Sequence, residues 1–576
     1  MSLGADRDRG AVLIVAPRHP CLSRFGGGSI QAKLQVMTRR GAAATLTNLD
    51  TLLNSPLREA PLGRGPLGAG PMAAYYLESF LKRRGYRAAS LVDWDDRAAL
   101  ERAMRCDPLA VLLSTTFITE HSVLVECLTE LRAVVGAAPI VVGGPFVHKQ
   151  GRLLRRSGGR RARALAEFGV VEADHLLFAP GRPAVLDGCV FVAEAQGERT
   201  ALRVLERLER GARAPEGFDD IPNLVLRSGA GGWRHTGCDP EPLALDAEFT
   251  RWDLVDEMPS VVPVRTSVGC AGRCRFCDFR SMHVRPGRHR IDTVVEEMRL
   301  ATSRGAAIFN FMDDDLFAAG CRGRSLAEAI IRAELDVLWG SMLRPDHVMA
   351  DDARVACEAG FRFGLAGVES GSRAQLSRMG KDMDPAAAAQ GVEALAARGA
   401  RIDMTLIVGF PGETDETLDE TAAWLNGLAR GLPGCATYEL YPFLLQPQTV
   451  ADTPAFRRRF RLEGRGLRWS HATSDAGAAV RSSTPRVFRA VDGASYFYGG
   501  DDVPSWWTPA RRDAAFASRN ALARAFLDGA GDPEIQSRFE ALTRHVADPR
   551  PGRPSPAWAD ILAPRGAQPI TGAEPR

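Results

Sequence analysis

The chain has 576 residues, and 73 basic against 70 acidic side chains leave a formal net charge of +3. This near balance argues against a nucleic-acid binder that relies on phosphate contacts. The length is too great for one core and suggests about three or four domains. No apolar run is long enough to span a membrane, and the N-terminus lacks the apolar core of a signal peptide. Eight of the eleven cysteines are scattered as reduced thiols would be, so we expect a cytoplasmic protein that needs no membrane.

Short apolar runs alternate with amphipathic segments in the first 211 residues. The runs predict strands at 11–16, 88–92, 110–114, 139–144 and within 187–198. The helical patterns lie at 71–84, 97–105, 122–135 and 200–211. We expect a doubly wound α/β domain over residues 1–211, with ligands at the carboxyl ends of its strands.

Two stretches after these elements have compositions that favour loops. Residues 151–163 are basic and rich in glycine, and we expect a solvated insertion there. Residues 212–258 are rich in proline, glycine and aspartate. They predict a linker that contains one short strand at 221–226.

A cysteine cluster follows the linker and reads Cys270-Ala-Gly-Arg-Cys274-Arg-Phe-Cys277. Three thiolates in a glycine-containing loop can converge on one metal centre. A closed structural zinc site needs a fourth protein ligand, and His283 and His289 are the nearest. A 4Fe-4S cluster held by three cysteines instead keeps one iron free to bind another molecule.

Strand and helix patterns continue to alternate around this cluster. The apolar runs predict six strands at 261–264, 307–312, 337–346, 363–368, 404–408 and 436–443. Polar or glycine-rich motifs end three of them. These motifs are Asp313-Asp314, Glu369-Ser370, and the turn that contains Gly409, Gly412 and Glu413.

The cysteine spacing resembles the signature of the radical S-adenosylmethionine (SAM) enzymes, which also have an aromatic residue before the last cysteine, here Phe276. The resemblance implies that Cys270, Cys274 and Cys277 hold a 4Fe-4S cluster and that SAM chelates its free iron. It also implies a partial (β/α)6 barrel over residues 259–455. Parallel barrels place their chemistry at the carboxyl ends of the strands.

The carboxylates after the second of these strands stand where the family contacts the methionyl amino group of SAM. A carboxylate suits an ammonium group, so Asp313 and Asp314 are the residues expected there. Three successive carboxylates also suit Mg²⁺, although no other motif suggests a phosphate substrate. The alternative is a solvated loop or a helix N-cap.

The two later motifs resemble further SAM-binding elements of the family. Glu369 and Ser370 correspond to a segment that approaches the ribose and the methionyl part of SAM. Gly409, Gly412 and Glu413 correspond to an element that packs against the adenine. The family usually has a glycine where this chain has a threonine, in the strand just before that element.

The N-terminal domain resembles the cobalamin-binding domain fused in front of many radical SAM enzymes. The matching residues are Ser114 and Thr115 after the third strand and the pair Gly143-Gly144 after the fourth. The resemblance implies that they approach the corrin and its nucleotide tail. The Asp-x-His-x-x-Gly sequence that supplies a lower axial histidine is absent after the first strand, and Thr116 replaces a leucine. The alternative is a domain without cofactor that only supports the barrel.

Residues 456–576 carry several aromatic side chains, and we expect a region that caps the barrel and contacts the substrate. The alternative is that these aromatics form an ordinary small core. Beyond about residue 548 the chain is rich in proline, arginine and alanine, which predicts disorder.

The resemblance implies a cobalamin-dependent methyltransferase that acts on an unactivated carbon of a small-molecule or peptide substrate. A radical derived from SAM would remove hydrogen, cobalamin would supply the methyl group, and a flavodoxin or ferredoxin would supply the electron. The alternatives are another radical SAM rearrangement or oxidation, and a non-catalytic cobalamin or redox sensor. A methylthiotransferase is disfavoured because the N-terminal region lacks a second cysteine triplet.

Overall fold

The structure is a computed structural model that describes residues 9–17, 70–156, 176–279 and 287–491, with short gaps inside these ranges, and scattered residues of 495–544. His283, the segment after the first strand, and the aromatics Phe497, Tyr498, Trp506 and Trp507 lie outside the described residues. So does the chain beyond residue 548. In the described part, no helix combines the length and the apolar character needed to cross a membrane.

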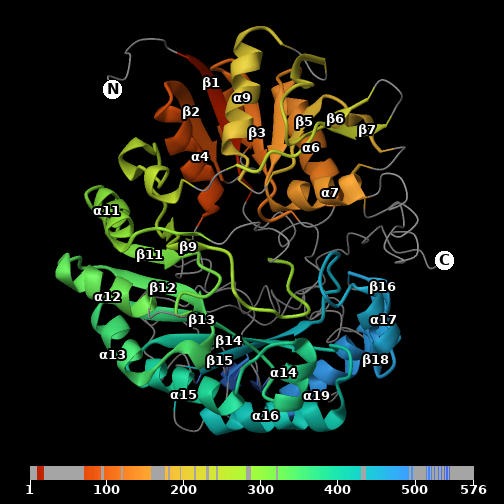
Figure 1. Cartoon of the computed structure of the whole chain (residues 1–576). Helices are drawn as coiled ribbons and strands as arrows, with labels where there is room; N and C mark the ends of the chain where they lie inside the picture. The colour runs from red at the N-terminus through yellow and green to blue at the C-terminus, as the bar shows by residue number, and fades with distance from the viewer. Residues whose placement is uncertain are drawn as a thin grey trace.

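The N-terminal part is built on one seven-stranded sheet with the order β2-β1-β3-β4-β5-β6-β7 (Figure 1). The first five strands in this order are parallel. Their bounds are β1 Arg9–Val15, β2 Tyr86–Leu91, β3 Ala110–Ser114, β4 Ile140–Gly143 and β5 Cys189–Val192. The doubly wound fold predicted for this region is confirmed, and the order reverses direction between β1 and β3.

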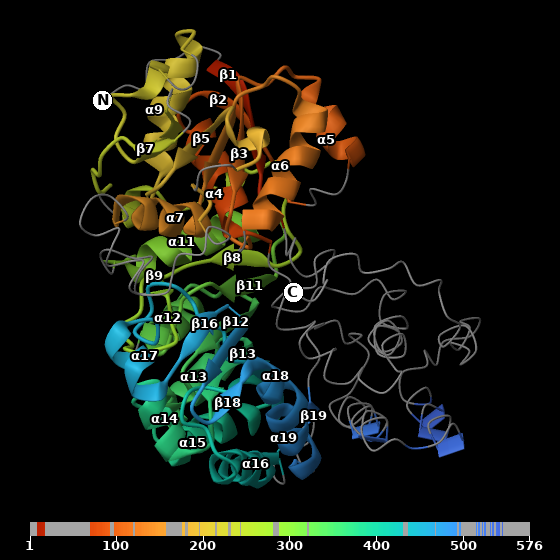
Figure 2. The same ribbon diagram turned by 90° about the vertical axis from the view of Figure 1, so that its right-hand side faces the viewer.

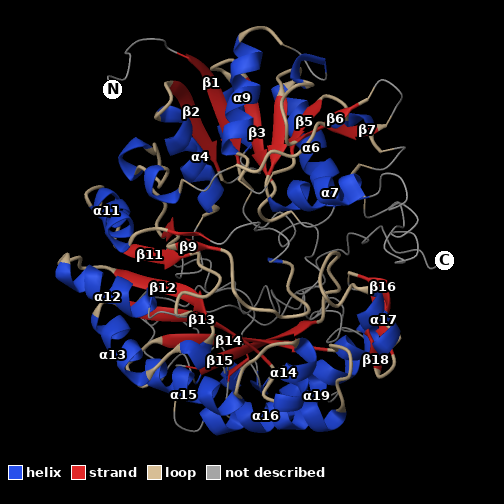
Figure 3. Cartoon of the chain, viewed as in Figure 1, coloured by secondary structure: helices blue, strands red, loops and turns tan. Residues whose placement is uncertain are grey.

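Helices lie on both faces of this sheet (Figure 3). They are α4 Met72–Lys82, α5 Arg97–Met104, α6 His121–Val135, α7 Pro145–Arg156 and α9 Glu198–Glu209. Two separate apolar clusters fill the space on the two faces. One face packs α6 and α7, because Val123, Leu124, Leu128 and Val147 are fully or nearly fully buried.

Helix α7 corrects the prediction of a solvated insertion for part of residues 151–163. Residues 151–156 continue the helix that Pro145 begins, and proline is tolerated at this first helical position. Near its start, Phe146 and Val147 pack into the apolar core on one face of the sheet. The many basic residues of the helix hide these apolar positions when the sequence alone is considered.

Part of the predicted linker also belongs to the N-terminal sheet. Strands β6 Leu224–Arg227 and β7 Trp233–His235 pair antiparallel with β5 and with each other. Leu224, Val225 and Leu226 are completely buried. This apolar run therefore extends the sheet, and the connector proper begins after it.

The second half of the chain is organised on another seven-stranded sheet, with the order β19-β15-β14-β13-β12-β11-β8. All neighbouring pairs are parallel. The strands are β8 Val262–Val264, β11 Ile308–Phe311, β12 Leu338–Leu343, β13 Phe361–Glu369, β14 Arg401–Val408, β15 Ala436–Pro442 and β19 Ser495–Tyr496. The six predicted strands are confirmed in their predicted order, and β19 adds a seventh from the region predicted as the C-terminal cap.

Helices separate these strands along the chain and line one side of the sheet (Figure 3). They are α11 Ile291–Thr302, α12 Arg322–Arg332, α13 Ala350–Glu358, α14 Arg373–Met379, α15 Pro385–Ala396 and α16 Asp415–Ala429. Local signals set several of their ends: Ser372 and Asp384 cap α14 and α15, and Gly380 ends α14 with a φ of 65°. The largest apolar core lies between this sheet and its helices.

On the opposite face of this sheet, several side chains are only half-buried. Leu365, Thr405, Ile407 and Tyr441 are intermediate in exposure, whereas Ala366, Leu406 and other alternate residues are buried. The register pairs Met342 with Leu365 and Ile407 with Tyr441. Half-buried side chains from neighbouring strands therefore share the inner face of the sheet.

The C-terminal region begins with α17 Pro454–Phe460 and a small antiparallel sheet of β16 Glu463–Arg465, β17 Arg468–His471 and β18 Ser474–Asp475. The helices α18 Ala476–Ala478 and α19 Thr484–Ala490 follow. Trp469 is 3% exposed and packs with Phe410 and Phe443 in a small apolar core. Trp469 therefore belongs to an ordinary small core, which was the alternative interpretation of the C-terminal aromatics.

The connector joins the two halves through buried contacts. Trp252 is completely buried, and its ring centroid lies 5.4 Å from that of Tyr75 on α4. Its Nε1–H donates to Glu297 Oε1 of α11 at 3.2 Å. Figures 1 and 2 both place α11 and the short strand β9 Ser267–Val268 at the junction of the two halves.

Glu297 makes this junction sensitive to pH, because burial raises its pKa from 4.5 to about 8. Between these values the folded state binds a proton that the unfolded state has released, so the free energy of unfolding falls as pH rises. The expected slope is up to about 1.4 kcal/mol for each pH unit, and it levels off above pH 8.

The Glu297→Gln variant should flatten this decline, because glutamine still accepts the Trp252 hydrogen bond but does not titrate. Urea unfolding between pH 5 and pH 9 measures the effect. Glu296→Gln on the exposed side of α11 is the matched control and should keep the slope of the unmodified protein. An unchanged slope in Glu297→Gln would show that other groups cause the pH dependence.

Candidate functional site

The cysteine loop runs between β9 and the carboxyl-end loops of the parallel sheet. Cys270, Cys274 and Cys277 are all half-buried. The backbone N–H of Arg275 donates to Met379 O at 2.7 Å, and the N–H of Ala451 donates to Arg275 O at 2.9 Å. The loop is therefore fastened on one side to the end of α14 and on the other to the segment before α17.

Two of the three thiols lie around a glycine of the loop. Gly272 lies between two of the sulfurs: its N–H donates to Cys270 Sγ at 3.3 Å, and a Cβ there would lie 3.2 Å from Cys270 Sγ and 3.9 Å from Cys274 Sγ. Glycine thus leaves the space on this side of the loop free for a ligand of the sulfurs. Among the described residues, no group of three or more His, Cys, Asp and Glu side chains is arranged to hold a metal ion.

The environment of two of the three thiols disfavours a free, reactive thiolate. Burial raises the pKa of Cys277 to about 12, with a smaller effect from the negative charge of Asp278. Burial also raises the pKa of Cys274, which the cations Lys381 and Arg344 partly oppose. Reactive cysteines have lowered pKa values. Thiols such as these lose their protons when they bind a metal.

His289, one of the two possible zinc ligands, is buried beside other partners. Its Nδ1 lies 3.8 Å from Asp246 Oδ1, and its backbone carbonyl accepts from Arg322 Nη2 at 2.6 Å. Burial lowers its pKa to about 4. The other, His283, lies outside the described residues.

Asp313 occupies a different position from the one expected for an open SAM contact. It is completely buried, and its carboxylate accepts hydrogen bonds from the Thr266 N–H at 2.8 Å, the Thr266 hydroxyl at 2.7 Å and the Ser267 hydroxyl. Arg322 donates to the same Thr266 hydroxyl at 2.7 Å. Asp313 therefore anchors the segment that leads into the cysteine loop.

Asp314 remains free for the role predicted for the pair. It is half-buried, and no hydrogen bond or ion pair to it is present among the described residues. Burial and the neighbouring carboxylates Asp313 and Asp315 raise its pKa to about 6. An ammonium group placed beside it would stabilise its charged form.

Two polar residues next to Asp314 form a pair that the sequence did not reveal. Asp315 Oδ2 lies 2.8 Å from His347 Nδ1, and this contact raises the pKa of His347. Asp315 also accepts from the Arg344 N–H at 3.2 Å. The pair joins the carboxyl ends of β11 and β12, and no local spacing could indicate a contact between residues so far apart in the chain.

Glu369 lies beside the cysteine loop through Lys381. The Nζ of Lys381 donates to Glu369 Oε1 at 3.0 Å, and both side chains are largely buried. Glu369 has a φ of 69°, which is strained for a residue other than glycine. Ser370 instead points to α16, where its Oγ lies 3.0 Å from Thr421 Oγ1.

The turn after β14 is held by its own glutamate. Glu413 Oε1 accepts from the Gly409 N–H at 2.8 Å, and burial raises the pKa of Glu413 to about 7. A Cβ at Gly409 would lie 2.7 Å from Trp469, and one at Gly412 would lie 2.7 Å from Arg378. Close packing and positive φ values therefore explain both glycines locally.

The residues predicted to bind cobalamin also lie together, at the ends of β3 and β4. Thr115 donates twice to Gly143 O, from its N–H and its hydroxyl, each at 2.8 Å. Gly144 has a φ of 105°, and a Cβ there would lie 2.9 Å from Thr115 Oγ1. A Cβ at Gly143 would meet only Val192 at an ordinary 3.7 Å. Ser114 Oγ lies 2.9 Å from Thr116 Oγ1.

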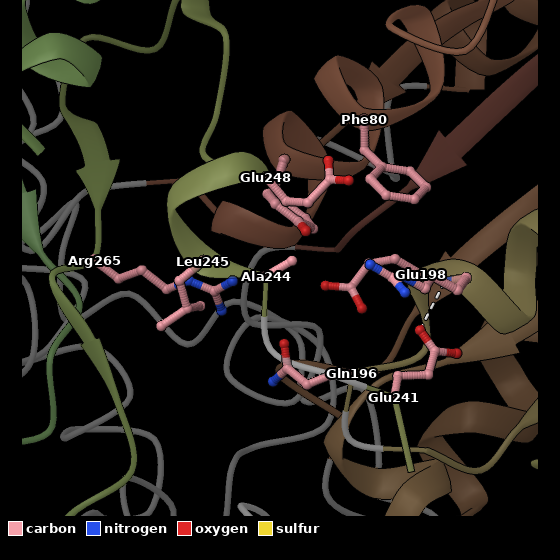
Figure 4. A pocket seen from close by; sticks show the side chains of 10 residues that line it. Phe80, Gln196, Glu198, Glu241, Ala244, Leu245, Glu248 and Arg265 are labelled. Carbon is pink, nitrogen blue, oxygen red and sulfur yellow. Dashed lines mark hydrogen bonds between the residues drawn. The ribbon is translucent and has the colours of Figure 1, made fainter. Parts of the chain in front are cut away.

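A separate crevice lies between α4, the start of α9 and the connector (Figure 4). Arg265 enters it from the end of β8, 5.4 Å from the centre of the Tyr76 ring. Glu241 lines it and accepts from the N–H groups of Arg199 and Thr200, so it caps α9. None of the predicted site residues lines this crevice.

Comparison with known families identifies the central part of the chain. Residues 264–425 match the Radical SAM superfamily. This part of the chain is a radical SAM domain. The match begins at the last residue of β8 and includes the cysteine loop, Asp314, Glu369 and the turn after β14. The resemblance seen in the cysteine motif is thereby confirmed.

Solved structures agree with the radical SAM domain in fold. The radical SAM methyltransferase TsrM from Kitasatospora setae, with tryptophan substrate and a SAM analogue bound, superposes with a TM-score of 0.56. The identity is 15%, and the alignment covers 93% of this chain and 99% of that one. TsrM has also been solved with cobalamin and a [4Fe-4S] cluster, with a TM-score of 0.54 to this chain.

Two curated relatives match the sequence over part of their lengths. An uncharacterized methyltransferase of Pyrococcus horikoshii is 25% identical over 45% of this chain and 58% of its own. The anaerobic magnesium-protoporphyrin IX monomethyl ester cyclase of Rubrivivax gelatinosus is 21% identical over 66% of this chain and 65% of its own. This chain thus spans less than two thirds of the length of either relative.

Proposed function

We propose that this radical SAM protein is a cobalamin-dependent methyltransferase that acts on an unactivated carbon of a small-molecule or peptide natural product. In this proposal Cys270, Cys274 and Cys277 hold a 4Fe-4S cluster. The cluster, SAM and cobalamin supply the radical and methyl-transfer chemistry when bound. The protein then binds and orients these components and excludes water from them.

The observation that carries the proposal is the contact between the two expected cofactor regions. Helix α7 starts directly after Gly143-Gly144 at the end of β4, and its Lys149 forms an ion pair with Asp278, which follows Cys277. A doubly wound domain binds ligands at the carboxyl ends of its strands. Its ligand edge therefore lies against the cysteine loop, as methyl transfer between two cofactors requires.

Residues of the radical SAM domain have separable roles in this proposal. Asp314 offers a half-buried carboxylate for the amino group of SAM. Glu369, paired with Lys381, lies next to the cysteine loop, where it can meet the ribose or methionyl part. The inner face of the sheet presents the half-buried residues Leu365, Ile407 and Tyr441 to the adenine and substrate. An electron donor such as a flavodoxin or ferredoxin would act from outside, and we propose a cytoplasmic location.

A second candidate function is a radical SAM reaction without methyl transfer, such as a rearrangement or an oxidation. The similarity to the cyclase of Rubrivivax gelatinosus favours it. In that case the N-terminal domain could bind cobalamin for another purpose or serve as a scaffold.

Anaerobic reconstitution with iron, sulfide and hydroxocobalamin separates these functions. We expect about four irons and one corrin for each chain, measured by metal analysis and absorption. Four irons for each chain without corrin would contradict the proposed cobalamin-dependent methyltransferase and favour the second function. Failure to cleave SAM under strong reductant, with both cofactors bound, would instead favour a non-catalytic sensor.

Gly143→Ala tests the corrin site within the same experiment. Its Cβ would make only an ordinary contact with Val192, so the thermal unfolding of the cofactor-free protein should not change. Hydroxocobalamin binding should weaken several-fold, because the methyl group fills space on the ligand edge. Gly232→Ala, where a Cβ would meet nothing within 4 Å, is the control. Equal corrin affinity in both variants would contradict the placement of the corrin at Gly143.

A further inference from the structure

Helix α7 contacts the cysteine loop through side chains that no family motif includes. Lys149 Nζ forms an ion pair with the Asp278 carboxylate, and the two side chains are only 16% and 14% exposed. Gln448 Nε2, from the loop after β15, donates to Lys149 O at 3.1 Å. One turn of α7 is thus joined both to the cysteine loop and to the carboxyl-end loops of the parallel sheet.

The position of Lys149 links this contact to the ligand edge of the N-terminal sheet. The first hydrogen bond of the helix runs from the His148 N–H to Gly144 O at 3.0 Å. Lys149 follows Gly144 by five residues, which corresponds to about 7.5 Å along a helix. A helix is rigid over this length, so the contact fixes the distance between the end of β4 and the cysteine loop.

Asp278 is also electrically coupled to the cysteines. It follows Cys277 directly in the sequence, and its negative charge acts on that thiol. Charges interact strongly where the surroundings are largely shielded from water. A cation held beside Asp278 therefore offsets negative charge next to the sulfurs, and reduction potentials of iron-sulfur clusters respond to nearby charge.

We propose that Lys149 is a positioning residue for the two cofactors of this protein. Its ion pair with Asp278 holds the ligand edge of the N-terminal domain against the cysteine loop and tunes the charge around the cluster. The proposal rests on the proposed function for the identity of the cofactors. The ion pair, however, can be tested without activity.

Four variants test the pair. Lys149→Met removes the cation, Asp278→Asn removes the anion, and Lys149→Asp with Asp278→Lys restores a pair of opposite polarity. Arg155→Met, on an exposed position of the same helix, is the matched control. The readouts are hydrogen exchange of residues 270–279 in the metal-free protein and the midpoint potential of the iron-loaded protein, followed by electron paramagnetic resonance.

Lys149→Met should speed amide exchange in residues 270–279 at least several-fold and lower the midpoint potential, because the carboxylate charge is less compensated. Asp278→Asn should speed exchange but raise the potential. The reversed pair should restore slow exchange, and Arg155→Met should match the unmodified protein. These opposite shifts in potential would not arise from a loss of packing alone.

Unchanged exchange and potential in Lys149→Met would overturn the proposal, as would failure of the reversed pair to restore slow exchange. The proposed function can fail separately. If the protein binds iron but no corrin, the exchange and potential results still decide the role of the ion pair. If it binds no iron, the exchange result alone decides it.

Discussion

Cys274→Ala should abolish cluster assembly and SAM cleavage while hydroxocobalamin binding persists. Two remaining thiols cannot complete a site that needs three ligands from the protein. Corrin binding should survive because Ser114, Thr115 and Gly143 lie at the edge of the other sheet. Iron content, absorption after reconstitution, and the formation of 5′-deoxyadenosine under strong reductant measure these outcomes.

The exposed Cys106 on the N-terminal domain provides the control for this variant. Cys106→Ala should retain the full iron content, since its thiol lies outside the cysteine loop. If Cys274→Ala keeps its iron, the cysteine loop does not hold the cluster. If it loses corrin while the fold stays intact, the assignment of the two cofactors to separate domains is wrong.

Of the substitutions at the site, Asp313→Ala should lower the free energy of unfolding the most. It removes the acceptor for three donors from Thr266 and Ser267 inside a completely buried setting. Each buried donor left without an acceptor costs about 1–3 kcal/mol. Urea unfolding should show this loss, and cluster loading should fail because the segment before Cys270 is no longer held.

Asp314→Asn is the matched comparison, because Asp314 has no hydrogen-bond partner in the described part of the chain. Its free energy of unfolding should stay within about 0.5 kcal/mol of the unmodified value. SAM binding should weaken if Asp314 meets the ammonium group. Equal stability of Asp313→Ala and Asp314→Asn would contradict the anchoring role, and unchanged SAM affinity in Asp314→Asn would remove its binding role.

Much of the fold could be predicted because the signals are local. The apolar runs at 11–16 and 110–114 predict buried strands, and they became β1 and β3. The cysteine spacing likewise identified the radical SAM domain, since the three cysteines of the motif lie within eight residues. Apolar runs and short-range ligand spacing are properties of neighbouring residues, so they can be recognised without a structure.

The partners of the polar residues required the tertiary structure. Asp313 and Asp314 are adjacent and equivalent in the sequence, but only Asp313 faces Thr266 across the strand ends. Lys149 lies in a helix that the sequence did not predict, and its partner Asp278 is 129 residues away. Composition and motifs determined the fold, the cysteine site and the class of chemistry. Which carboxylate anchors the loop, and which lysine joins the two halves, depends on the packing of parallel strands that are distant in the sequence, and only the tertiary structure decided it.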